Sequence, residues 1–237
     1  GPFILLMAGG KLIVAYWAIR GLGAPLRMMC EYANASYEPV LYQVCKKDGA
    51  WDKSSWFNVK PELQQQNALM NLPYIVDGDT VVTQSNACLS YLGRKFKLHG
   101  ENDQELLKVE QCLCEVSDLR NNCVRQFYLP PEVFNANLDE FLSATLPNSL
   151  AKLNCWLEQN GTTFLASNDA TTPDFHFFEL LDQLESLTSR YSKESTLRDF
   201  SCLRTYYKEF ASLPAVQKYL QSDLHKLPIN NPHASFQ

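Results

Sequence analysis

Two junctions between a strand-like run and a helix-like run carry residues that could bind an anion. At Gln84-Ser85, a serine hydroxyl and the unpaired amides of a helix start would together suit a carboxylate. At residues 21–23, Gly-Leu-Gly has the context of a dinucleotide-binding loop, but Leu26 stands where the third glycine belongs. We therefore reject a dinucleotide site. A serine at a helix start is more often only an N-cap, so the serine junction by itself does not establish a ligand site.

Other common chemistries have no support in the sequence. It contains no P-loop, HExxH or GxSxG motif, and its four histidines are too dispersed to suggest a metal cluster. The eight cysteines are scattered in apolar runs, which is typical of reduced thiols in the cytosol. Only Cys112 and Cys114 are close, and residues two apart on a helix do not face each other.

The elements that must position the Gly-Leu-Gly junction at residues 21–23 are a strand, a helix and a second strand. The run KLIVAYW, residues 11–17, predicts a strand, and the apolar spacing over residues 25–34 predicts a helix with one buried face. Residues 37–44 predict a second strand, which Pro39 places toward the edge of a sheet. This order predicts a βαβ unit.

The serine junction follows a predicted hairpin. Residues 73–76 and 80–83 are short apolar runs joined by Asp-Gly-Asp, and helical spacing resumes over residues 85–96. The preceding residues 45–70 are polar, contain three aromatic residues and show no sustained period, which predicts a long, partly helical connection.

After residue 99 the sequence predicts helices. An apolar stripe runs from Val109 to Phe127 and ends before a Pro-Pro pair, and residues 138–157 predict further helix interrupted near Pro147. Thr171 and Asp174 have the spacing of a capping box, followed by a buried helical face. An α/β unit followed by an all-helical unit is therefore expected.

Composition excludes several classes of protein. The chain has 237 residues, 46% of them hydrophobic, which is enough for a real core. Its formal charge of -5 gives no electrostatic reason to bind nucleic acid. The apolar stretch at residues 3–8 is too short to span a bilayer and lacks the flanks of a secretory signal, so we leave residues 1–10 out of the fold prediction.

Four segments closely resemble the cytosolic glutathione transferases, above all the mu class. They are YWAIRGLGAPLR (16–27), DKSSWFNVK (52–60), NLPYIVDG (71–78) and TQSNACLSYL (83–92). The resemblance covers about residues 11–225. It implies a thioredoxin-like glutathione-binding domain over 11–94, an all-α domain with the hydrophobic substrate pocket over 95–225, and a C-terminal tail over 226–237. It also implies a cytoplasmic homodimer.

The chemistry of such an enzyme requires a stabilised thiolate. A free thiol has a pKa near ~8.5 and is mostly protonated at neutral pH. A hydroxyl that donates to a charged acceptor contributes roughly 1.5 to 3 kcal/mol, which corresponds to a pKa lower by about 1 to 2 units. By resemblance, Tyr16 is that donor, and Tyr128 is a second catalytic tyrosine that assists some additions.

The same resemblance implies a set of glutathione contacts and no metal. Ser85 and Gln84 would bind the γ-glutamyl carboxylate, the Leu72 backbone before a cis Pro73 would pair with the cysteinyl part, and Asp118 would reach the glutathione amine of a neighbouring subunit. The remaining contacts would come from Trp17, Leu22, Lys53, Trp56, Lys60 and Asn71.

Two alternatives to a transferase stay open. Lys53 stands where the mu pattern commonly has arginine, and the pocket region at 120–127 bears little likeness to the family. A glutathione-binding structural subunit with little turnover is therefore one alternative. A glutathione-dependent isomerase or peroxidase that uses the same site is the other, and the hydrophobic electrophile cannot be named from the sequence.

Overall fold

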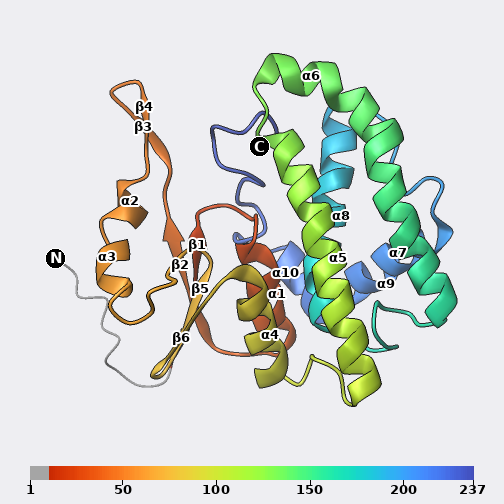
Figure 1. The fold of residues 1–237 in the computed structure, drawn as a ribbon, viewed down its shortest axis with the longest axis horizontal. Helices are drawn as coiled ribbons and strands as arrows, with labels where there is room; N and C mark the ends of the chain where they lie inside the picture. The colour runs from red at the N-terminus through yellow and green to blue at the C-terminus, as the bar shows by residue number, and fades with distance from the viewer. Residues whose placement is uncertain (1–10) are drawn as a thin grey trace.

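A mixed four-stranded sheet forms the N-terminal part of the protein in the computed structural model, which describes residues 11–237 (Figure 1). Its order is β2-β1-β5-β6. Strands β1 (Leu12–Trp17) and β2 (Tyr37–Tyr42) are parallel and are joined by helix α1 (Gly23–Tyr32). Strand β5 (Tyr74–Asp77) is antiparallel to β1, and β6 (Thr80–Thr83) is antiparallel to β5. The predicted βαβ unit, hairpin and edge position of Pro39 are confirmed.

The connection between the two halves of the sheet contains a second hairpin that the sequence analysis missed. Strands β3 (Cys45–Lys47) and β4 (Ala50–Asp52) pair with each other, and the short helices α2 (Ser54–Phe57) and α3 (Lys60–Leu63) follow. Most residues of β3 and β4 are exposed on both faces, so no apolar alternation marks them. Only the helical part of this connection was correctly predicted.

The C-terminal part consists of packed helices. Helix α4 (Ser85–Lys95) completes the α/β part, and the long α5 (Asp103–Phe127) begins the helical part. A π-helical turn over Phe141–Thr145 separates α6 (Pro131–Glu140) from α7 (Leu146–Asn160), close to the predicted interruption. Helices α8 (Thr172–Arg190), α9 (Ser201–Ser212) and α10 (Pro214–Leu220) complete the fold.

The central helix α8 begins with the capping box that the sequence predicted. The Asp174 carboxylate accepts from the Thr171 amide at 2.7 Å and from the Leu165 amide at 2.9 Å. Burial raises the pKa of Asp174 to about 6, although these hydrogen bonds favour its ionised form. The cap therefore fixes both the start of α8 and the loop before it.

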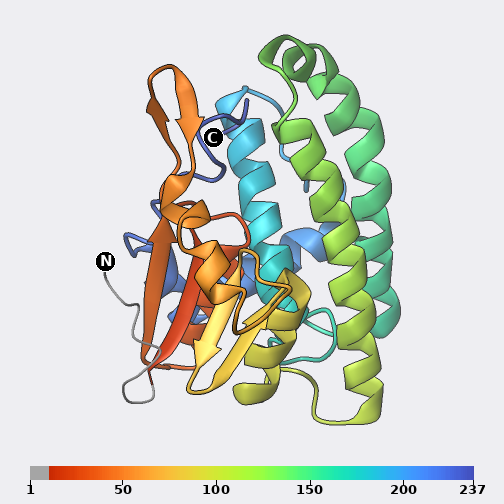
Figure 2. The same cartoon turned by 60° about the vertical axis from the view of Figure 1, so that its left-hand side comes forward.

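The two faces of the sheet are covered differently (Figure 2). Helices α1 and α4 lie between the sheet and the helical part, and their apolar residues share one large core with α5 through α10. The opposite face carries α2 and α3 over a small separate cluster made of Ala15, Tyr42, Trp56, Leu63, Met70, Tyr74 and Val76. The sheet is thus held between a large shared core and a small local one.

A buried ion cluster ties the loop after β1 to the helical part. Arg20 Nε lies 2.9 Å from Glu179 Oε1, and Arg20 Nη2 lies 2.5 Å from Asp182 Oδ2. Burial alone would lower the pKa of Arg20, but these two carboxylates raise it above its ordinary value. The loop that follows Tyr16 is therefore anchored by charge as well as by packing.

No helix within residues 11–237 is long and apolar enough to cross a bilayer. The predicted apolar stretch at 3–8 lies outside the described residues. The described cysteines are all free thiols, and the Cys112 side chain is buried while that of Cys114 is exposed. The two neighbouring cysteines therefore point to different environments, as predicted.

Candidate functional site

Tyr16 lies near the end of β1 with its side chain almost fully buried, at 6% exposure. Its hydroxyl makes no hydrogen bond to any residue of the described chain. A buried phenol normally pairs its hydroxyl. The Tyr16 hydroxyl is thus available as a donor for a ligand.

The Gly-Leu-Gly loop makes room for the Tyr16 ring. Gly21 has φ +38°, and a Cβ at that position would lie 2.8 Å from Tyr16 Cε1 and 3.2 Å from the Tyr16 hydroxyl oxygen. A Cβ at Gly23 would lie 2.9 Å from Tyr16 Cβ. The two glycines therefore allow the backbone to approach the tyrosine closely, which is a role that the rejected dinucleotide motif did not suggest.

The predicted serine junction opens onto a polar cavity of about 260 Å³. Gln84 has φ 74° and ψ 126°, a backbone conformation that residues other than glycine rarely adopt, and it turns the chain from β6 into α4. Leu22, Gln84 and Ser85 line the cavity together, so the structure unites three of the predicted contacts. The other lining residues are Asn86, Ser117, Arg120, Asn121 and His176.

The turn before β5 is fixed to Thr83, the last residue of β6. The Leu72–Pro73 peptide bond is cis, as the resemblance implies. Thr83 holds this turn: its hydroxyl accepts from the Asn71 amide at 3.0 Å and donates to the Asn71 carbonyl at 2.8 Å. Asn71 itself is exposed. Thr83 is therefore a positioning residue for this turn. It lies in the 83–92 segment that resembles the family, but it was not among the predicted site residues.

Trp56 and Lys60 lie together on the other side of the sheet. The Trp56 ring is 1% exposed and packs against Tyr42 and Tyr74, with ring centroids 5.1 and 6.0 Å away. The Lys60 ammonium lies 5.9 Å from the Trp56 ring centroid. The structure therefore places Trp56 mainly in the small core, with Lys60 as the charged group beside it.

The C-terminal tail covers the second predicted tyrosine. The Asn231 amide donates to the Tyr128 hydroxyl at 3.1 Å, and the His233 ring packs against Tyr128 with centroids 5.2 Å apart. Burial raises the pKa of Tyr128, and the nearby Tyr16 contributes in the same direction. Burial also lowers the pKa of His233, assisted by the charge of Lys53. Tyr128 thus contacts the tail directly, and Lys53 is close enough for its charge to act on His233.

The tail also bonds to the loop after Tyr16. The Arg20 amide donates to the Pro228 carbonyl at 2.7 Å, and the Gly21 amide donates to the Ile229 carbonyl at 3.1 Å. Trp17, just before this loop, is half-buried. Nothing in the pattern of the tail sequence predicted these contacts.

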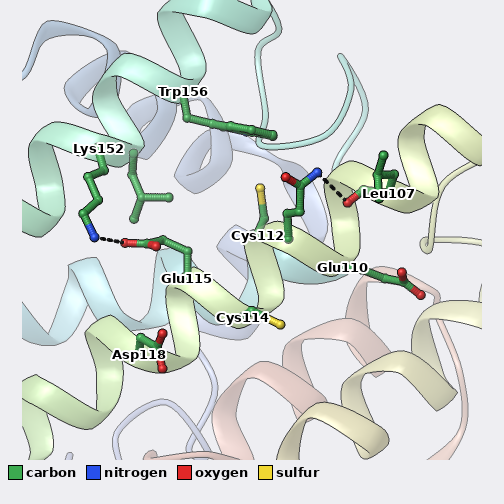
Figure 3. A pocket seen from close by; sticks show the side chains of 10 residues that line it. Leu107, Glu110, Cys112, Cys114, Glu115, Asp118, Lys152 and Trp156 are labelled. Carbon is green, nitrogen blue, oxygen red and sulfur yellow. Dashed lines mark hydrogen bonds and ion pairs between the residues drawn. The ribbon is translucent and has the colours of Figure 1, made fainter.

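Asp118 does not face the cavity beside Ser85. It lines a separate groove of about 530 Å³ on α5. Figure 3 shows Glu115 and Cys114 on the same helix and Trp156 across the groove. Lys152 crosses from α7 and pairs with Glu115 at 3.2 Å. Asp118 is exposed there and is not among the buried residues of α5. Within one chain it does not reach the other predicted glutathione contacts.

Five residues that line the cavity were missing from the predicted site, and two of them, Arg120 and His176, carry ionisable side chains. His176 and Arg120 line the cavity beside Ser85, but His176 lies inside an apolar run and Arg120 in a helix of mixed charges, so neither stands out in the sequence. Residues 11–237 contain no group of three or more histidine, cysteine or acidic side chains arranged to hold a metal ion.

An α/β domain of thioredoxin-like topology, joined to a helical domain and carrying an anion-suited cavity at the start of α4, defines the general class. The chain matches the family described as "Glutathione S-transferase, N-terminal domain" over residues 13–94. It matches "Glutathione S-transferase, C-terminal domain" over residues 117–223. The protein belongs to the glutathione S-transferase family.

Mu-class members are among its similar relatives. The chain is 32% identical to mouse glutathione S-transferase Mu 5 over 231 residues, which is 97% of each chain. It is 32% identical to human glutathione S-transferase Mu 3, covering 95% of each. The solved glutathione S-transferase Blo t 8 superposes with a TM-score of 0.80 at 26% identity, covering 94% of this chain and 99% of that one.

Proposed function

We propose that this protein is a glutathione transferase that conjugates the glutathione thiolate to hydrophobic electrophiles. The observation that carries the proposal is the Tyr16 hydroxyl, which belongs to a mostly buried side chain beside Gly21 and has no hydrogen-bond partner among the described residues. Its hydrogen bond would stabilise the thiolate, which then attacks an electrophilic carbon. A carbon–sulfur bond forms, the leaving group departs with the electron pair, and the thiol proton passes to solvent.

Further residues would position the tripeptide. Ser85 and the first amides of α4 would hold the γ-glutamyl carboxylate, with Gln84 beside them, and the Leu72 backbone before Pro73 would pair with the cysteinyl unit. Lys60 would meet the glycyl carboxylate. Trp17, Leu22, Lys53, Trp56 and Asn71 would complete the walls. In this proposal, the domain over residues 11–94 would bind glutathione, and the domain over 95–225 would bind the electrophile. The tail over 226–237 would close the electrophile pocket.

We extend the proposal to a cytoplasmic homodimer. Asp118 is exposed in the groove of Figure 3 and does not line the cavity of its own chain, so it would be free to meet the glutathione amine bound by a second copy. The Asn231 amide occupies only a lone pair of the Tyr128 oxygen, so the Tyr128 O–H would stay free to donate its proton to the electrophile when it assists additions.

The direct test is an ultraviolet difference titration of glutathione on the wild-type protein, combined with conjugation of an activated aromatic chloride. We expect the bound thiolate to form well below about pH 8, because a hydrogen bond to an anion lowers its pKa. Conjugation should accompany it. Binding without a thiolate or turnover would indicate a structural subunit, and a thiolate without conjugation would indicate an isomerase or peroxidase.

Ser85→Ala should weaken glutathione binding about tenfold, because a hydrogen bond to a charged carboxylate is lost. The dissociation constant can be measured by calorimetry. Ser90→Ala, in the same helix but outside the cavity, is the matched control and should bind as the wild type does. Equal affinities for Ser85→Ala and wild type would refute the carboxylate contact.

A further inference from the structure

His176 is a buried histidine without a partner. Its side chain is on α8, the residue is 2% exposed, and neither ring nitrogen has a hydrogen bond within the described chain. The flanking Phe175 and Phe177 are fully buried in the main core. An apolar side chain at this position could fill the same space and would leave no buried polar atom unpaired, unlike histidine. A buried polar group left unpaired is costly, so the ring requires a partner that the described residues do not supply.

The cavity beside Ser85 is where that partner can sit, because His176 lines it. The other buried histidine of this region, His99, differs in that its Nδ1 pairs with the Thr172 hydroxyl at 3.0 Å. The fold therefore supplies a hydrogen-bond partner for the ring of His99. Among the described residues it supplies none for the two ring nitrogens of His176, which lines the cavity.

The charge of the cavity selects the kind of ligand. Arg120 lines it, is half-buried and makes no ion pair with any residue from 11 to 237, and no acidic side chain is among the lining residues. The start of α4 adds unpaired amides and the positive end of a helix of 11 residues. An anion is therefore favoured over a cation.

The protonation state of His176 fits a hydrogen-bonding role rather than a charged one. Burial, and to a smaller extent the charge of Arg120, lowers the pKa of His176 to about 3. The ring is thus neutral at physiological pH and offers one N–H donor and one acceptor. Arg120 supplies the positive charge, while His176 supplies a directed donor from the buried side.

We propose that His176, together with Arg120, binds the α-carboxylate of the γ-glutamyl group of glutathione, opposite Ser85. This inference rests on the proposed function, since it names a further determinant of the same binding site. The carboxylate has more acceptor sites than the Ser85 hydroxyl and the α4 amides use, so a donor from α8 is compatible with them. The γ-glutamyl end of glutathione would then be bound by residues of both domains, Ser85 on α4 and His176 on α8.

The test compares three ligands: glutathione, an analogue with 4-aminobutyrate in place of the γ-glutamyl unit, which lacks the α-carboxylate, and a glutaryl analogue, which lacks the amine. Calorimetry gives the affinity of each for wild type, His176→Leu and His176→Gln. We expect His176→Leu to bind glutathione and the glutaryl analogue about tenfold more weakly. Its affinity for the aminobutyryl analogue should stay unchanged, and His176→Gln, which keeps a donor, should lose less than His176→Leu.

Several results would overturn the inference. Equal loss for all three ligands would indicate a merely structural role, and no loss for any would mean that the ring pairs only with water. His99→Leu, which removes a buried imidazole away from the cavity, is the control and should bind all three as the wild type does. If the wild type fails to bind glutathione, the proposed function falls as well, whereas wild-type binding with an unaffected His176→Leu refutes this inference alone.

Discussion

Tyr16→Phe is expected to raise the pKa of bound glutathione by about 1 to 2 units, because the substitution removes one hydrogen bond to the thiolate. The side chain keeps its ring, so packing against Gly21 and glutathione affinity should change little. At a pH below the raised pKa, kcat/KM for an aromatic chloride should fall about tenfold to hundredfold. The ultraviolet difference titration and steady-state rates measure the two effects.

The control for this prediction is Tyr91→Phe. Tyr91 donates to Asp77 at 2.7 Å on the same domain, so its replacement also removes one tyrosine hydroxyl but not the one beside Gly21. We expect no change in the thiol pKa for this variant. A thiol pKa in Tyr16→Phe equal to that of the wild type would rule out Tyr16 as the donor.

Arg20→Met should lower the free energy of unfolding by about 3 to 5 kcal/mol, because it leaves the buried Glu179 charge without its main partner. The side chains of Arg20 and Glu179 are only 7% and 2% exposed, so water cannot replace the lost contact. Reversible urea unfolding measures the difference. The double variant Arg20→Met/Glu179→Met removes both charges and should recover much of the loss.

The deficit of Arg20→Met should also depend on pH. Burial raises the pKa of Glu179, and in the wild type Arg20 offsets that effect. Without Arg20, the folded-state pKa lies further above the unfolded value, so this carboxyl adds stability at low pH that is lost as pH rises through the folded pKa. The deficit should therefore be smaller near pH 4.5 than near about pH 7.5. A deficit below about 1 kcal/mol at neutral pH would contradict the importance of the ion pair.

Strong local signals made much of the fold predictable. The Asp-Gly-Asp turn at 77–79 marks a hairpin because Gly78 adopts a positive φ of 59° there. Thr171 and Asp174 mark the start of α8 through a reciprocal cap that depends only on residues three apart. These elements are encoded by neighbouring residues, and so sequence patterns reveal them.

The hairpin of β3 and β4 was missed although it carries a usable signal. Asp48 and Gly49 both have positive φ, 51° and 81°, as an Asp-Gly turn allows. The strands beside it are three residues each and mostly exposed, so they lack the alternation on which strand prediction depends. In this segment the Asp48-Gly49 pair is thus a better indicator of a hairpin than the pattern of apolar residues.

The site was predictable only where a motif is contiguous. Tyr16, Ser85 and Pro73 lie in segments that resemble the family, and of these three Ser85 lines the cavity at the start of α4. His176 and Asn231 reach the same region from α8 and the tail, through contacts between residues far apart in the chain. Such long-range juxtaposition leaves no periodic trace in a single sequence.

The unequal cores on the two faces of the sheet divide the molecule into regions of different local stability. The large core joins α1 and α4 to the helices of the C-terminal part, so we expect these elements to open together, at a free energy close to that of global unfolding. Trp56 and Leu63 belong to the small cluster under α2 and α3, which can open locally at much lower free energy. Glutathione held near Trp56 and Lys60 would therefore order the least stable face of the domain. Part of its intrinsic binding energy would be spent on that ordering, and its affinity would fall with any change that loosens this cluster.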